Sequence, residues 1–184
     1  MRMLDRQVER YLRGSLRGSF EALVLVGTVA PSSDSAGRLV RVFVAPQGRR
    51  CEYLDTGEIY LAQEAAGVVA VWRLNPKSRV ASLVEESKEA APPRRAKRSA
   101  RVETYRSLRC AVEESEERSA ELVAKTREWR VLDQKAQNWV LRAELQAYTG
   151  QQLAYVFLWD TLEIQFKNLP SDLFTVPSDY RVTP

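Results

Sequence analysis

The sequence predicts an α+β protein in which a small antiparallel β-domain is followed by one long helix. Three observations support this fold class. Five short apolar runs separated by turn residues occupy the first half of the chain. The segment 102–149 contains neither Pro nor Gly, and its apolar residues recur at three- and four-residue spacing, which is typical of a helix. After Gly150 the pattern returns to strand, and we expect a β-hairpin that rejoins the sheet.

Composition limits the classes of function. The 184 residues are 45% hydrophobic and 28% charged, as in an ordinary globular domain. No apolar run approaches the roughly 20 residues of a membrane helix, and no secretory signal is recognisable, so we expect no membrane span. Cys51 and Cys110 fit neither a disulfide framework nor a metal-ligand spacing. These features favour a reducing intracellular compartment, the cytoplasm or nucleus, with mitochondrial targeting left open.

The absence of histidine narrows the chemistry further. Ser-His-Asp and Cys-His nucleophilic systems and HExxH zinc sites all need that side chain. Phosphate-binding and dinucleotide-binding glycine loops are missing as well. The sequence therefore predicts no catalytic residues, no metal, no cofactor and no small-molecule substrate.

The first element, 1–18, is expected to be an amphipathic basic helix. Leu4, Val8 and Leu12 lie on one side of it, and arginines surround the other side. A mitochondrial presequence is the alternative, but such peptides avoid acidic residues, and Asp5 and Glu9 are present.

The second element, 19–80, is the predicted β-domain. About five short strands with no helical segment between them form an antiparallel meander that curls into a small barrel or half-sandwich. Residues 23–26 are apolar on both faces, which predicts a central strand. The expected strands are 21–30, 39–45, 50–54, 58–62 and 68–74.

The remaining elements complete this division of the chain. A basic, proline-containing linker occupies 81–101, and the long helix follows over 102–149. Acidic residues at 113–121 interrupt the apolar face, so two helices hinged near Ser115, or a short coiled coil, remain alternatives. We expect the hairpin at 150–169, turning at Asp160-Thr161, and an extended tail at 170–184.

One short string resembles a catalytic signature. Asp55-Thr56-Gly57, preceded by Tyr53 and Leu54, is similar to the active-site triplet of retroviral-type aspartic proteases, in which two chains each supply one aspartate. That family usually has alanine after the triplet, where this chain has Glu58. Because Asp-x-Gly is also common in tight turns, we favour a hairpin turn here.

The segment 94–109 is strongly basic and is the best sequence clue to a binding partner. Such a segment would neutralise several phosphates without reading base sequence, and the sequence pI of about 9.2 is compatible with this. A localisation signal, a polybasic lipid contact and a solvated linker are the alternatives. The candidate nucleic-acid-binding residues are Arg94, Arg95, Lys97, Arg98, Arg101, Arg106 and Arg109.

We expect a non-catalytic interaction or scaffold subunit of a larger intracellular assembly, whose partner is a protein, either a second copy or another subunit. In this hypothesis the long helix buries apolar and aromatic side chains against the partner. The alternative is a nucleic-acid-binding module. The candidate partner-binding residues are Leu122, Trp129, Leu132, Trp139 and Val140.

Overall fold

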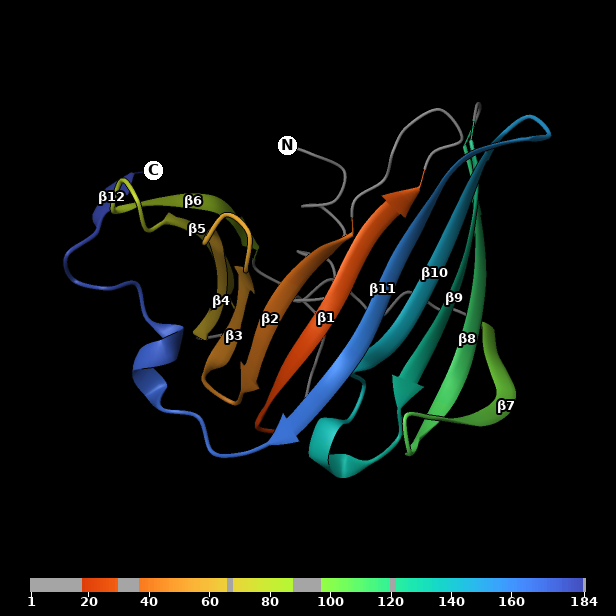
Figure 1. Ribbon diagram of the computed structural model, residues 1–184, viewed down its shortest axis with the longest axis horizontal. Helices are drawn as coiled ribbons and strands as arrows, with labels where there is room; N and C mark the ends of the chain where they lie inside the picture. The colour runs from red at the N-terminus through yellow and green to blue at the C-terminus, as the bar shows by residue number, and fades with distance from the viewer. Residues whose placement is uncertain (1–17, 30–36, 66–67, 88–96, 120–121, 184) are drawn as a thin grey trace.

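The protein forms one strongly curved sheet of twelve strands (Figure 1). The computed structural model describes residues 18–29, 37–65, 68–87, 97–119 and 122–183. The strand order is β12-β6-β5-β4-β3-β2-β1-β11-β10-β9-β8-β7, and every neighbouring pair is antiparallel except the parallel pair β12–β6. The strands are β1 (Phe20–Val29), β2 (Arg38–Ala45), β3 (Gly48–Tyr53), β4 (Ile59–Ala65), β5 (Val68–Asn75), β6 (Val80–Ser87), β7 (Lys97–Tyr105), β8 (Leu108–Arg118), β9 (Val123–Val131), β10 (Val140–Thr149), β11 (Gln152–Phe166) and β12 (Arg181–Thr183).

The expected α+β fold is wrong. Within the described ranges there is no α-helix, only the two short 3-10 turns η1 (Gln134–Ala136) and η2 (Ser171–Phe174). β1 to β5 lie where the five apolar runs were found, but they are part of the twelve-stranded sheet and not a small separate domain. Residues 1–17 of the expected helix at 1–18 and the middle of the expected linker, 88–96, lie outside the described residues. The two ends of that linker belong to β6 and β7.

The long helix predicted over 102–149 is replaced by the end of β7 and by β8, β9 and β10. In β10 the buried side chains Ala143, Leu145 and Ala147 alternate with more exposed ones, which is the two-residue period of a strand. Each of these strands alternates buried and exposed residues, and the alternation starts again after each turn. When the strands and turns are taken as one segment, the apolar residues therefore fall at three- and four-residue spacing. Those turns contain no glycine: Arg106, Ser107 and Asn138 adopt positive φ angles of 47°, 64° and 67° themselves.

The hairpin predicted to turn at Asp160-Thr161 is also wrong. β11 continues through these residues as a single strand of 15 residues. Its pairing with β1 shifts register between Leu23 and Val24, where Leu162 has no partner. Such an extra residue is a β-bulge, which bends the strand and does not end it.

Most of the main core lies on one face of the sheet, here named the core face. On β1 this face carries Phe20, Ala22, Val24 and Val26, all at most 1% exposed. Because cross-strand partners point to the same side, β2 and β11 add further buried side chains, among them Trp159, which pairs with Val26. The η1 turn closes one end, where the backbone at Gly18 comes so close to Lys135 that an added Cβ would lie 1.8 Å from its carbonyl oxygen.

A second core lies on the opposite face, here named the outer face, over β2 to β6. Phe43 and Leu61 project there and pack with Leu169 and Phe174 of the C-terminal segment. Figure 1 shows that segment, in dark blue, beside β3 and β4. Two hydrogen bonds fix it: Arg50 Nη1 donates to the Leu173 carbonyl at 3.2 Å, and Gln63 Nε2 donates to the Phe174 carbonyl at 2.6 Å.

Phe174→Ala should therefore lower the free energy of unfolding by about 3–5 kcal/mol, since it removes a fully buried ring and leaves a cavity. Urea unfolding followed by tryptophan fluorescence measures the change. Ser171→Ala, an exposed position in the same turn, is the control and should change stability by less than about 0.5 kcal/mol. Equal effects of the two variants would contradict the docking of this segment.

Candidate interaction surfaces

Two of the five candidate partner-binding residues lie in the core. Trp139 and Val140 are 1% and 3% exposed. The Trp139 ring packs against Phe20 and Trp159, with centroid distances of 5.2 and 5.7 Å, and its Nε1 donates to Thr161 Oγ1 at 3.2 Å. In this fold their side chains stabilise the sheet and are not accessible to a partner.

The other three candidates are dispersed. Trp129 is 8% exposed, and its Nε1 donates to Glu103 Oε2 at 2.8 Å. Leu122 is half-buried beside the main core, while Leu132 is 46% exposed just after β9. Without the helix, the five residues do not form a common stripe.

The basic segment is divided by the fold. Arg94 and Arg95 lie outside the described residues, and Lys97 and Arg98 belong to β7. Arg101 and Arg106 each form an ion pair with a carboxylate, Glu103 and Asp160 respectively. Arg109 is exposed in β8. The described part of the basic segment therefore consists of the edge strand β7, its turn and the start of β8. Two of its arginines, Arg101 and Arg106, are paired with carboxylates.

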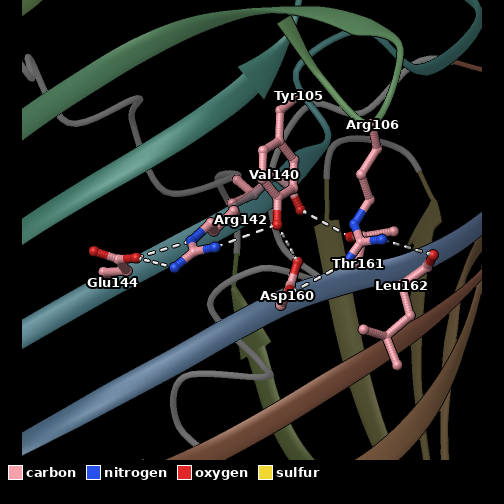
Figure 2. A network of polar contacts seen from close by, with 8 residues as sticks. All are labelled: Tyr105, Arg106, Val140, Arg142, Glu144, Asp160, Thr161 and Leu162. Atoms are coloured by element: carbon pink, nitrogen blue, oxygen red, sulfur yellow. Dashed lines mark hydrogen bonds and ion pairs between the residues drawn. The ribbon is translucent and has the colours of Figure 1, made fainter. Parts of the chain in front are cut away.

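A polar network fastens the β7–β8 turn onto β10 and β11 (Figure 2). Tyr105 Oη donates to Asp160 Oδ1 at 2.8 Å, and Arg106 Nη2 lies 3.3 Å from Asp160 Oδ2. Arg142 Nη1 donates to the Tyr105 oxygen at 3.3 Å. Asp160 is thus the acceptor that joins the turn to the middle of the sheet.

Arg142 links this network to a neighbouring carboxylate. Its Nε donates to Glu144 Oε1 at 2.8 Å, and its guanidinium lies 5.6 Å from the centre of the Trp129 ring. The hydrogen bond to Tyr105, followed by the Glu144 contacts, raises the pKa of Arg142, against the opposing effect of burial. The Arg142 cation is permanent, so this side chain can hold structure or bind an anion but does not transfer a proton.

Tyr105→Phe should lower the free energy of unfolding by about 1–2 kcal/mol, because it leaves a half-buried carboxylate without its hydroxyl donor. The same substitution in an Asp160→Asn background should have a smaller effect, since the two residues share one interaction. Tyr148→Phe removes a hydroxyl bonded to Gln146 on the exposed surface and is the control. Additive effects of Tyr105→Phe and Asp160→Asn would show that these two residues have no interaction energy with each other.

Asp55-Thr56-Gly57 forms the turn between β3 and β4. Gly57 has a φ angle of 72°, a conformation that favours glycine, and its N–H donates to the Tyr53 carbonyl at 2.8 Å. Both Asp55 oxygens accept from Arg38, at 2.8 Å each. The hydrogen bonds from Arg38 lower the pKa of Asp55 and outweigh the raising effect of its slight burial. The aspartate therefore pairs with a cation within its own chain.

This pairing predicts a pH dependence. Because the pKa of Asp55 is lower in the folded state than its unfolded value of about 3.9, the pair adds stability above that pH and loses it as the pH falls through the folded value. Asp55→Asn should cost no more than about 1 kcal/mol at neutral pH, since the Asp55 side chain is 51% exposed. The difference should vanish in acid. NMR titration of the carboxyl group, with Arg38→Gln returning its pKa toward the ordinary value, checks the assignment.

Neither cysteine is poised for chemistry. Cys51 and Cys110 are both free and fully buried. Burial raises the pKa of the Cys110 thiol to about 11 and that of Cys51 still higher. The parts of the chain that the structure describes contain no cluster of three or more Cys, Asp or Glu residues arranged to hold a metal ion.

An apolar patch on the outer face was missed by the sequence analysis. On β1, Leu25 pairs with Leu39 of β2, and Val29 pairs with Val156 of β11. Val29 and Leu39 are 52% and 40% exposed, and Leu158 of β11 lies opposite Gly27, which has no side chain. We name Leu25, Val29, Leu39, Val156 and Leu158 the outer patch. Its signal was the apolarity of both faces of these strands, which also predicted that β1 is central.

The outer face changes character beyond β11. Over β10, β9 and β8 it carries charged pairs together with the buried side chains of Trp129 and Val112. Arg142 contacts Glu144, and Arg127 contacts Glu114 at 2.7 Å. Further along, the hollow lined by Glu116, Arg118, Val123, Lys125, Tyr148 and Gly150 measures about 220 Å³ and is wide open. Opposite charges alternate across these strands, so this half of the face has no single sign.

No protein-family model and no curated protein matches the sequence. None of the helical turns in the described ranges has the length or apolar character needed to cross a bilayer.

Solved structures share the fold. An uncharacterized conserved protein from Thermus thermophilus is 12% identical, with 97% of this chain and 98% of that chain covered and a TM-score of 0.54. The structure of PNGF-II is 9% identical, with a TM-score of 0.58, and the match covers 90% of this chain but 30% of that one. A LolA superfamily protein from Nitrosomonas europaea is 11% identical over 95% of this chain and 98% of that one, with a TM-score of 0.45. At these identities, the first two structures establish similarity of fold and nothing about activity.

Proposed function

We propose that this chain is a non-catalytic protein-interaction subunit that assembles with a second copy of itself through the outer face of its sheet. The observation that carries the proposal is the outer patch: leucine and valine side chains that remain partly exposed on the central strands of the sheet. Contiguous apolar side chains on an otherwise charged surface commonly mark protein–protein contacts.

The shape of the face suits another sheet. β2, β1, β11 and β10 lie side by side as a broad band in Figure 1. Two packed sheets interdigitate their side chains at a separation of about 10 Å.

Charge supports a second copy as the partner. The pairs Arg142–Glu144 and Arg127–Glu114 flank the outer patch with equal numbers of both signs. A surface without a dominant sign does not repel its own copy, whereas a strongly basic or acidic one does.

Nucleic-acid binding by the basic segment is the weaker candidate. Arg101 and Arg106 already contact carboxylates, which would compete with phosphate oxygens for the guanidinium groups. The same surface therefore offers phosphates less positive charge than the sequence suggests.

Light scattering behind a sizing column tests the proposal. The wild-type chain should elute as a dimer with twice the 21.0 kDa mass of one chain. Leu39→Glu should weaken the dimer at least about tenfold, because it places an unpaired charge inside the apolar contact. Leu132→Glu changes a leucine of similar exposure outside the outer patch and is the matched control.

A wild-type monomer at high protein concentration would overturn the proposal. Equal weakening by Leu39→Glu and Leu132→Glu would place the contact elsewhere. Loss of the larger species only at high salt, with release of bound nucleic acid, would favour the alternative function.

A further inference from the structure

The two edge strands of the sheet, β12 and β7, differ in length. At one end β12 contributes three residues. At the other, β7 contributes nine, and no other strand in the described part of the chain pairs with its far side. An unpaired strand edge displays free main-chain N–H and C=O groups to which another extended segment can bond.

The geometry of the β7–β8 turn shows which groups are free. Tyr105 pairs with Leu108 across the two-residue turn Arg106-Ser107, whose positive φ angles are those of a type I′ turn. The residues that close such a turn, here Tyr105 and Leu108, are hydrogen-bonded to each other. Non-hydrogen-bonded and hydrogen-bonded pairs then alternate along the two strands. Thr104 and Val102 therefore direct their N–H and C=O groups away from β8.

The regular part of this edge is short and accessible. Between Arg98 and Val102 the register with β8 shifts, so the regular ladder covers 102–105. Val102 is 51% exposed, and Thr104 is exposed as well. Two outward residues offer up to four main-chain hydrogen bonds, enough for a transient complex.

Charge indicates the kind of segment that fits. On its occupied side β7 pairs with β8, which places Glu114 opposite Lys97 and Glu113 opposite Arg98. An antiparallel segment on the free side would lay its C-terminal half along the same basic stretch, as β8 does.

We propose that the free edge of β7 binds an extended segment of another protein by strand addition, and that this segment has apolar residues followed by acidic ones, the pattern of β8 itself. The proposal does not depend on self-assembly through the outer patch, because it uses a different surface. Main-chain hydrogen bonds at Val102 and Thr104 give the binding energy, and the basic residues set the direction of the incoming strand.

A labelled peptide with the sequence of residues 111–118, Ala-Val-Glu-Glu-Ser-Glu-Glu-Arg, is the probe. Fluorescence anisotropy with the full-length protein should show saturable binding. Thr104→Pro removes the outward N–H without touching a bond to β8 and should weaken binding at least about tenfold, the equivalent of one hydrogen bond. Thr104→Val keeps the N–H and should bind as the wild type does. A peptide with its glutamates replaced by lysine should not bind.

Val102→Pro with Val102→Thr as its control is a second pair, for use if Thr104→Pro fails to fold. Absence of peptide binding to the wild-type protein would overturn the proposal. Equal binding by the Pro and Val variants would do so too, since attraction between charges alone needs no free N–H. If Thr104→Pro instead dissociated the dimer, the β7 edge would be the self-association surface. The strand-addition proposal would then be rejected, and the outer patch would no longer be assigned to the dimer contact.

Discussion

The pairing of β1 with β11 is the interaction that unites the sheet. β2 to β6 all follow β1, and β7 to β10 all precede β11, so the two halves meet through this pair in the middle of the strand order. The ladder extends from Phe20–Phe166 to Val29–Val156. Ser19 continues it by donating its hydroxyl to the Lys167 carbonyl at 2.7 Å. Residues more than a hundred positions apart must find each other, so the entropy of closing that loop has to be offset by burial along both strands.

Both strands are suited to this role because they are apolar on two faces. Val24, Val26 and Trp159 lie in the main core, while Leu25 and Leu158 lie on the outer face. A strand in the middle of a sheet is most stable when both faces are covered. Here the outer face of these strands remains partly open among the described residues, and this mismatch is the physical basis of the outer patch.

The outer face is handled differently on the two sides of that patch. Over β2 to β6 the C-terminal segment covers it with Phe174 and Leu169, so the cover is apolar. Over β10 and β11 the Tyr105–Asp160–Arg142 network holds the β7–β8 turn in place with hydrogen bonds. Hydrogen bonds hold a covering segment less firmly than buried aromatic rings do, because water competes for each hydrogen bond. The β7 edge thus lies on the less firmly held side of the molecule.

The sequence by itself determined the local features of the first half. Alternating apolar runs, separated by turns at positions such as Asp55-Thr56-Gly57, located β1 to β5, and the apolarity of 23–26 identified β1 as central. The sequence failed from residue 81 onward, since β6 lies where a linker was expected. Beyond residue 97 the turns use Arg106, Ser107 and Asn138 in left-handed conformations, without the glycine that normally marks them. Only tertiary structure decided that these segments are strands, since cross-strand partners and not local propensity select the two-residue period. It also decided the site: burial moved Trp139 and Val140 into the core, and pairing across the whole chain brought Leu25, Leu39 and Leu158 together on one face.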